Sequence, residues 1–250
     1  MKNITIKSDS LLLSGDKVFF SLQGEGISIG KPAVFLRLHL CNLKCSFCDT
    51  KYTWDRKDKR FYTEPERWSI ERTVKEIEKY HCHRLVITGG EPLLQREALI
   101  QLIDRLEPDN LPSSWYSSWS FEIETNGTFA PLDKNKIGIR DLQYNVSPKL
   151  KNSGNPRKLR YKPKILKQYN EKRYNSVFKF VVIQPDDLIE IRRIVAECDL
   201  DKNKIILMPE GTTQEKVAKH GRAVVELCKK EGWQLIPRLQ VMLWGDIRKK

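Results

Sequence analysis

Short, continuous apolar runs recur along the chain and alternate with segments of helical periodicity. The runs are too short for helices and do not alternate apolar with polar residues, which is typical of strands buried on both faces of a parallel sheet. We predict strands over residues 34–38, 85–88, 121–124, 143–146, 177–183 and 204–208, and a weaker one over 234–236. Helices are predicted over residues 70–80, 96–106, 188–197 and 213–230. This alternation predicts an α/β fold with parallel strands, in a sheet that is open or closed into a barrel.

In both versions of this fold, ligands bind beyond the carboxyl ends of the strands. The segments predicted at that edge are HLCNLKCSFCDT, GGEPLLQ, TNGT, SPK and PEGTT. Their Cys, Gly, Pro, Glu and Asn residues predict a binding site there. Residues 55–66 and 109–120 are typical of surface insertions rather than linkers. We therefore expect residues 1–250 to form one domain.

The charge of the chain is concentrated in one window. Lys and Arg number 45 against 32 Asp and Glu, a net charge of +13. Residues 149–173 hold ten basic residues and one Glu, so they carry +9 of it. Such a window is compatible with a nucleic-acid surface, with an anionic ligand nearby, or with a solvated basic face.

The apolar runs also bear on localisation. None approaches the roughly 18 residues that span a bilayer, and MKNITIKSDS at the start lacks the apolar core of a signal peptide. We expect a cytoplasmic protein with no membrane partner.

Three of the six cysteines, Cys41, Cys45 and Cys48, are crowded into the spacing C-x-x-x-C-x-x-C. Their thiolates can meet at one centre only if the backbone curls around it. A structural zinc site needs four ligands, usually in two pairs; His39 offers a fourth ligand, but there is no second pair. An iron–sulfur cube normally takes four thiolates, and three would leave one iron open to a small ligand. The remaining cysteines (Cys82, Cys198 and Cys228) are expected to be buried small hydrophobes in a reducing compartment.

The cysteine spacing has a companion motif. Phe47 directly precedes the last of the three cysteines, and Gly-Gly-Glu-Pro (89–92) follows the next predicted strand. Together these motifs resemble the radical S-adenosylmethionine (SAM) superfamily. The resemblance implies a modified, incomplete (β/α) barrel and a [4Fe-4S] cluster held by Cys41, Cys45 and Cys48, whose open iron binds SAM. It also implies a reducing electron donor of flavodoxin or ferredoxin type.

Further sequence blocks resemble one particular family of this superfamily. SLQGEG (21–26), GKPAVFLR (30–37), CNLKCSFCDT (41–50), VITGGEPLLQ (86–95), EIETNGT (122–128), VSPKL (146–150) and FKFVV (178–182) resemble the 7-carboxy-7-deazaguanine synthase family. This implies conversion of 6-carboxy-5,6,7,8-tetrahydropterin to 7-carboxy-7-deazaguanine and ammonia, on the route to queuosine-type tRNA modification. It also implies regenerated SAM, assistance by Mg²⁺ and a homodimer.

The same resemblance suggests roles for individual residues. Thr50 matches the Mg²⁺ ligand, and its hydroxyl is the hard oxygen donor that this ion prefers. Arg37 can pair bidentately with a substrate carboxylate, and Gln23 offers a donor and an acceptor to a pterin edge. The full substrate set is Leu22, Gln23, Gly24, Arg37 and Thr88. The SAM set is Phe47, Cys48, Asp49, Gly90, Ser147, Pro148, Lys149, Met208, Pro209, Glu210 and Gly211.

The sequence departs from the family at its C-terminal end. Gln240 stands where some members carry His, and the chain ends in Arg-Lys-Lys where others end in Pro. Whether Glu25 and Glu91 are acid/base groups or structural acceptors stays open.

Two other functions are alternatives. A glycyl-radical activating enzyme shares the cysteine spacing but lacks the LQGEG block. A non-catalytic RNA-binding metal sensor would use the basic window, yet the sequence has no RNA-recognition motif. We therefore expect a small pterin partner and no direct nucleic-acid partner.

Overall fold

The computed structural model describes residues 4–107, 118–137, 141–245 and 247. The strands in these ranges form one sheet, in the order β3-β1-β2-β4-β5-β6-β7-β8-β9. Their bounds are β1 (Ser10–Leu22), β2 (Pro32–Leu38), β3 (Glu66–Ser69), β4 (Arg84–Gly89), β5 (Ser120–Thr125), β6 (Asp141–Val146), β7 (Asn175–Val182), β8 (Ile205–Pro209) and β9 (Gln234–Leu235). From β2 to β9 all neighbours are parallel, whereas β1 pairs antiparallel with β2 and β3.

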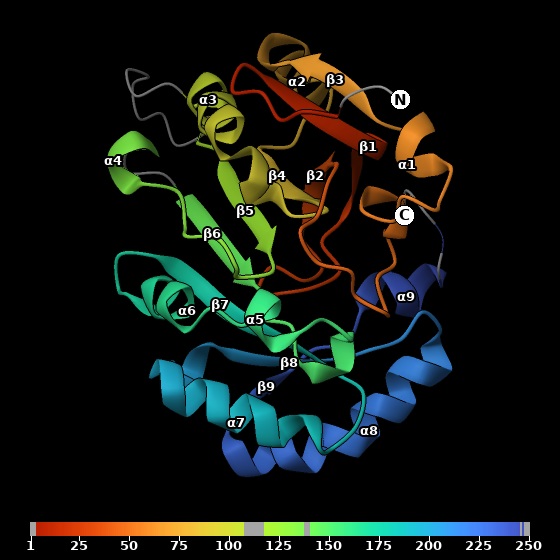
Figure 1. Ribbon diagram of the computed structural model, residues 1–250, viewed down its shortest axis with the longest axis vertical. Helices are drawn as coiled ribbons and strands as arrows, with labels where there is room; N and C mark the ends of the chain where they lie inside the picture. The colour runs from red at the N-terminus through yellow and green to blue at the C-terminus, as the bar shows by residue number, and fades with distance from the viewer. Residues whose placement is uncertain (1–3, 108–117, 138–140, 246, 248–250) are drawn as a thin grey trace.

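Helices lie between the strands. The α-helices are α1 (Arg60–Thr63), α2 (Ile70–Ile77), α3 (Arg96–Leu106), α4 (Lys134–Ile137), α5 (Arg157–Arg160), α6 (Pro163–Asn170), α7 (Asp187–Cys198), α8 (Gln214–Glu231) and α9 (Leu239–Trp244). Four 3₁₀ turns join them: η1 (Lys51–Thr53), η2 (Pro92–Gln95), η3 (Lys151–Ser153) and η4 (Lys202–Lys204). The sheet curves, and α3, α6, α7 and α8 lie on its outer side (Figure 1). Among the described residues, β3 and β9 remain its two edges, so the barrel is incomplete.

The seven predicted strands and four predicted helices are confirmed. β2 and β4 to β8 each carry side chains that are buried on both faces; Leu36, Ile87 and Phe178, for example, are all inaccessible to solvent. Capping groups fix the helix ends: the Ser69 hydroxyl accepts a hydrogen bond from the Arg72 N–H at the start of α2. At the end of α8, Gly232 adopts φ 71°, a conformation that glycine takes at little cost. None of the described helices is long and apolar enough to cross a membrane.

One sequence expectation is corrected by the fold. Residues 55–66 are not a plain surface insertion, because Glu66 begins β3, which pairs with β1. Within the same stretch α1 buries Phe61, whose ring lies 4.8 Å from that of His39. Of the other expected insertion, residues 108–117 lie outside the described part of the chain, and Ser120 already belongs to β5.

The parallel order sets the position of the site. The carboxyl ends of β2, β4, β5, β6, β7 and β8 lie along the same edge of the sheet. The five segments of the predicted binding site follow the ends of β2, β4, β5, β6 and β8. The three cysteines outside these segments differ in burial. Cys198 and Cys228 are buried as expected, whereas Cys82 is only partly buried.

Candidate active site at the cysteine loop

The cysteine loop, residues 41–50, follows β2 and is held by the segment after β4. The Gly90 N–H donates to the Leu38 carbonyl (3.0 Å), and the Glu91 N–H donates to that of Leu40 (2.8 Å). A Cβ atom on Gly90 would lie 1.9 Å from the Leu40 oxygen. Gly90 is therefore required by the close approach of the two loops.

Glu91 is completely buried beneath this contact. Its carboxylate accepts hydrogen bonds from Leu93 N–H (3.1 Å), the Thr125 hydroxyl (2.8 Å) and Asn126 N–H (2.7 Å). Burial raises its pKa, although these donors oppose the shift. In this geometry Glu91 joins the ends of β4 and β5, a structural acceptor rather than a group facing the pocket.

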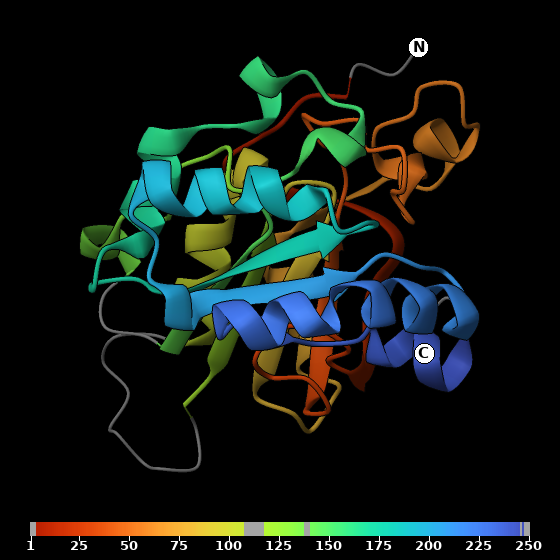
Figure 2. The same ribbon diagram turned by 90° about the horizontal axis from the view of Figure 1, so that it is seen from below.

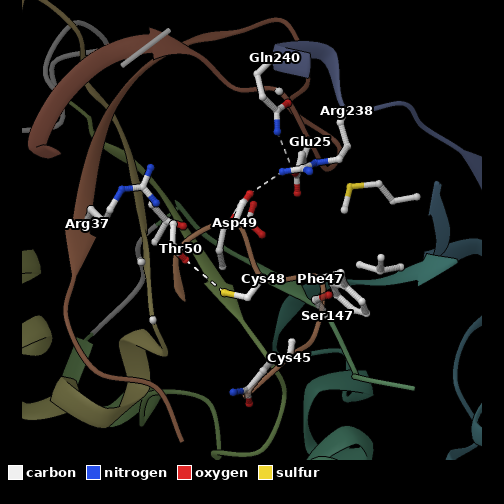
Figure 3. A pocket seen from close by; sticks show the side chains of 18 of the residues that line it. Glu25, Arg37, Cys45, Phe47, Cys48, Asp49, Thr50, Ser147, Arg238 and Gln240 are labelled. Atoms are coloured by element: carbon white, nitrogen blue, oxygen red, sulfur yellow. Dashed lines mark hydrogen bonds and ion pairs between the residues drawn. The ribbon is translucent and has the colours of Figure 1, made fainter. Parts of the chain in front are cut away.

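A cavity of about 340 Å³ opens inside the cysteine loop (Figure 3). It brings together most of the predicted site residues from six separate segments. They are Leu22, Gln23, Gly24, Arg37, Cys41, Cys45, Phe47, Cys48, Asp49, Thr50, Thr88, Gly90, Ser147, Lys149, Met208 and Glu210. Pro148, Pro209 and Gly211 do not line it.

The three thiols are candidate ligands for a metal group. All three line the same cavity. Yet within the described ranges no group of three or more His, Cys, Asp and Glu side chains is placed to hold one metal ion. Burial raises the pKa of Cys41 to about 12 and also raises that of Cys45, so metal binding has to displace their protons. His39, the possible fourth zinc ligand, is buried against Phe61 and does not line the cavity.

Arg37 supplies the clearest opening for an anionic ligand. Its guanidinium stacks over the Phe19 ring at 5.4 Å, and its buried Nε has no hydrogen-bond partner. An orphan donor on a cation suits a carboxylate, which accepts two parallel N–H bonds. Nearby, the Thr50 hydroxyl lies 3.6 Å from Cys48 Sγ, and Lys149 Nζ donates to the Ser147 hydroxyl (2.7 Å).

Gln23 differs from the simple expectation. Its Nε2 donates to Glu122 (3.2 Å) and Glu124 (3.3 Å), and its Oε1 accepts from the Glu25 N–H (3.2 Å). These bonds use the side chain within the protein and leave it only 3% exposed. Gln23 therefore orders the wall of the pocket rather than presenting a free donor and acceptor.

A charged network at the pocket floor was missed by the sequence analysis. Lys179 Nζ lies between Glu25 (2.6 Å) and Glu124 (2.8 Å), and its side chain is 3% exposed. Burial alone would lower the pKa of Lys179, but the two carboxylates outweigh it and raise the pKa. The sequence did contain one indication of this network, because Lys179 is the lone charged residue in the apolar run of β7.

Two residues from the C-terminal segment complete the network. Arg238 donates to Glu25 (3.2 Å), to Asp49 (2.6 Å) and to the Gly211 carbonyl (2.9 Å), while Gln240 donates to Glu25 (2.8 Å). Figure 3 shows Arg238 and Gln240 pointing toward Glu25. Burial by itself would raise the pKa of Glu25, but the charges of Lys179 and Arg238 prevail and hold it well below its usual range. Glu25 thus stays ionised at neutral pH.

Comparisons with known proteins agree with this geometry. Residues 22–165 match the family described as a 4Fe-4S single cluster domain. The 7-carboxy-7-deazaguanine synthase of Pyrobaculum aerophilum is 34% identical over 94% of this chain and 96% of its own. This chain belongs to the 7-carboxy-7-deazaguanine synthase family. The family member from Halobacterium salinarum is 32% identical over 95% of this chain and 93% of its own.

The fold comparison points to the same family. The crystal structure of QueE from Escherichia coli superimposes with a TM-score of 0.65 and 26% identity, covering 92% of this chain and 94% of that chain. As a 7-carboxy-7-deazaguanine synthase family member, the chain is a radical SAM enzyme with the superfamily's incomplete barrel. The family match therefore supports a [4Fe-4S] cluster and SAM as the cofactors of this chain.

Proposed function

We propose that this protein is a carbon–nitrogen lyase that converts 6-carboxy-5,6,7,8-tetrahydropterin to 7-carboxy-7-deazaguanine and ammonia. The observation that carries the proposal is one cavity that is lined by the three thiols, by Arg37 with its unpaired Nε, and by the LQGEG loop. A SAM-binding cluster and a carboxylate-bearing substrate would then lie in one chamber.

Within this proposal Cys41, Cys45 and Cys48 hold the [4Fe-4S] cluster. When bound, the cluster and SAM supply the radical chemistry that the ring contraction needs. Arg37 binds the substrate carboxylate, and Thr50 offers a hydroxyl to Mg²⁺. The Phe47–Asp49, Ser147–Lys149 and Met208–Gly211 segments bind SAM.

The charged network has a role of its own in this proposal. Glu25 and Glu124 are acceptors that Lys179 fixes before any ligand arrives, and Arg238 also holds Glu25. Preorganised acceptors of this kind suit the N–H donors of an aminopyrimidine ring, because no reorganisation is needed on binding. The protein residues therefore bind and orient the substrate.

The wider context is also part of the proposal. We place the enzyme in the cytoplasm as a single-domain protein that forms a homodimer and feeds queuosine-type tRNA modification. It would take electrons from a flavodoxin- or ferredoxin-type donor. The absence of a membrane-spanning pattern in the described helices is compatible with this placement.

Anaerobic turnover tests the proposed reaction. Protein reconstituted with iron and sulfide, reduced with dithionite and supplied with SAM, Mg²⁺ and the carboxy-tetrahydropterin, should release ammonia and the deazaguanine acid in equal amounts. If 5′-deoxyadenosine accumulates while the pterin is untouched, the substrate assignment is wrong. Omission of Mg²⁺ from the same assay tests the role of Thr50: the rate should fall in the parent and change less in Thr50→Val.

A further inference from the structure

The cysteine loop has an inner and an outer side. Leu43 and Cys45 are buried toward the pocket, whereas Asn42, Lys44 and Ser46 are exposed. In the proposed function the inner side is occupied by SAM and substrate. A protein that delivers an electron must therefore approach the outer side.

A second segment lies against this outer side. The Ser153 carbonyl accepts a hydrogen bond from the Ser46 N–H (3.0 Å), and Asn155 Oδ1 accepts one from the Lys44 N–H (2.8 Å). Asn155 Nδ2 in turn donates to Cys45 Sγ (3.3 Å). The segment after η3 thus contacts a predicted cluster ligand directly.

This segment opens the basic window of the sequence. Lys151, Arg157 and Lys158 are exposed, as is Lys44 beside them. Arg157 faces Glu197 at 3.4 Å, but Lys44, Lys151 and Lys158 have no ion pair with any described residue. Leu159, 46% exposed, adds an apolar contact among these charges.

Two acidic groups that contact this segment are already engaged. Asp187 accepts hydrogen bonds from Asn152 Nδ2 (2.9 Å) and from the Ile183 N–H (2.8 Å). Glu190 of α7 pairs with Arg160 (2.8 Å) and accepts a hydrogen bond from the Lys151 N–H (2.7 Å). The surface therefore keeps a positive excess next to the cluster loop. In Figure 2 the segment from η3 to α6 runs along the upper surface, away from α8 at the bottom.

We propose that Lys44, Lys151, Arg157, Lys158 and Leu159, here called the basic face, dock an acidic protein that carries a low-potential one-electron centre. The inference rests on the proposed function, which requires such a donor. The donor loses one electron and the cluster gains it, and no bond is made or broken in docking. Opposite charges accelerate and orient such encounters, whereas uniformly placed charge would not select one face.

A charge-reversal variant tests the basic face. Lys44→Glu, Lys151→Glu and Lys158→Glu are combined, and reduced flavodoxin serves as the probe. The KM for flavodoxin should rise about tenfold or more, and its salt dependence should weaken, because the steering charges are gone. Turnover with dithionite should stay within about twofold of the parent, since a small reductant needs no docking surface.

The matched control carries the same change in net charge elsewhere. Lys75→Glu on α2 with Lys219→Glu and Lys230→Glu on α8 changes three exposed lysines away from the cysteine loop. Flavodoxin-driven turnover in this control should match the parent. Isothermal titration calorimetry with oxidised flavodoxin measures the affinity of both variants for the donor, independently of product formation.

Each contrary outcome is decisive. Equal losses in the two triple variants would show general charge steering and overturn the proposal, as would an unchanged KM for flavodoxin in the Lys44, Lys151 and Lys158 variant. If dithionite supports the parent but neither reduced flavodoxin nor reduced ferredoxin does, the proposal is also wrong.

A second variant is needed if the triple variant loses iron. Lys151→Gln combined with Lys158→Gln leaves the cysteine loop unchanged, and its KM for flavodoxin then decides the proposal. Failure of the parent with dithionite would instead count against the proposed function.

Discussion

At the scale of single residues, the buried thiols show why the site needs its metal. Burial raises the pKa of Cys45, and the nearby Lys149 only partly offsets it. Asn155 donates to its sulfur and so fixes where the side chain points. In the proposed function the protein thus positions the thiol, and binding of the cluster would displace its proton.

Cys45→Ala should abolish cluster assembly, because two thiolates cannot hold the cube. Iron and sulfide content after anaerobic reconstitution, with the visible absorption of the product, measures this. Cys82→Ala is the matched control, since Cys82 lies outside the pocket, and it should bind iron like the parent. A Cys45→Ala protein with full iron content and turnover would contradict the ligand assignment.

Glu25 makes the stability of the protein depend on pH. Its pKa in the folded protein lies below the ordinary 4.5, so its stabilising contribution is present above about pH 4.5 and is lost as the pH falls below that value. Urea unfolding of the metal-free protein between pH 6 and pH 3 should therefore show a decline that Glu25→Gln reduces, by about 2 kcal/mol for a paired carboxylate.

The control for this prediction is Glu226→Gln, whose side chain is 75% exposed beside Lys229. It should leave the pH dependence unchanged, because an exposed pair contributes little. Parallel curves for the parent and Glu25→Gln would show that Lys179 and Arg238 do not hold Glu25 as the structure indicates.

At the scale of elements, the sequence predicted most of the sheet, because buried parallel strands are continuous apolar runs. β1 was missed since Gly15, at φ 58°, and a register shift between Leu13 and Val18 interrupt its pattern. β3, Glu66–Ser69, is a short polar edge strand whose pairing with β1 no local pattern reveals.

The candidate site also contains residues that the sequence revealed and residues that it did not. Residues carried by motifs, such as Gly90 and Arg37, were found from the sequence. Lys179, Glu124 and Arg238 come from three distant segments, and only the curvature of the sheet brings them together. The sequence cannot show such a meeting, although a lone Lys inside an apolar strand is a usable sign.

Arg238 connects the segment before α9 to three loops, through Glu25, Asp49 and the Gly211 carbonyl. We expect Arg238→Met to lower kcat/KM for the pterin by about 10- to 100-fold, since Glu25 and Asp49 lose a partly buried charge partner. Arg238→Lys should recover only part of this, because a lysine cannot reproduce the planar fork. Steady-state kinetics that separate KM from kcat, with iron content measured in parallel, check the prediction.

Arg222→Met is the control for Arg238, since Arg222 is exposed on α8. It should change neither kinetic constant. If Arg238→Met loses iron together with activity, Arg238 acts by holding the cysteine loop through Asp49 rather than by positioning Glu25.

At the scale of the whole molecule, the main hydrophobic cluster does not include the cysteine loop, whose Phe47 packs against a smaller cluster formed by β7, β8 and Ile236. The main cluster of buried side chains includes members of β1, β2 and β4 to β8 together with α2, α3, α6, α7 and α8. Within the described ranges, none of its members lies between residues 41 and 50. We therefore expect the sheet to form before the [4Fe-4S] cluster is inserted. A zinc finger, in contrast, depends on its metal to fold.

Removal of the cluster should accordingly lower the midpoint of thermal unfolding while leaving the far-UV circular dichroism unchanged. A group that binds only the folded state stabilises it, and each kcal/mol corresponds to about 2–4 °C in a chain of this size. We expect a decrease of about 3–10 °C after chelation under anaerobic conditions. Hydrogen exchange should become faster in the cysteine loop and in the segment around Asn155 that is bonded to it, but not in β4 to β7. Loss of the circular dichroism signal together with the iron would mean that the cluster organises the barrel itself, and that the metal-free protein cannot present a preformed site to SAM.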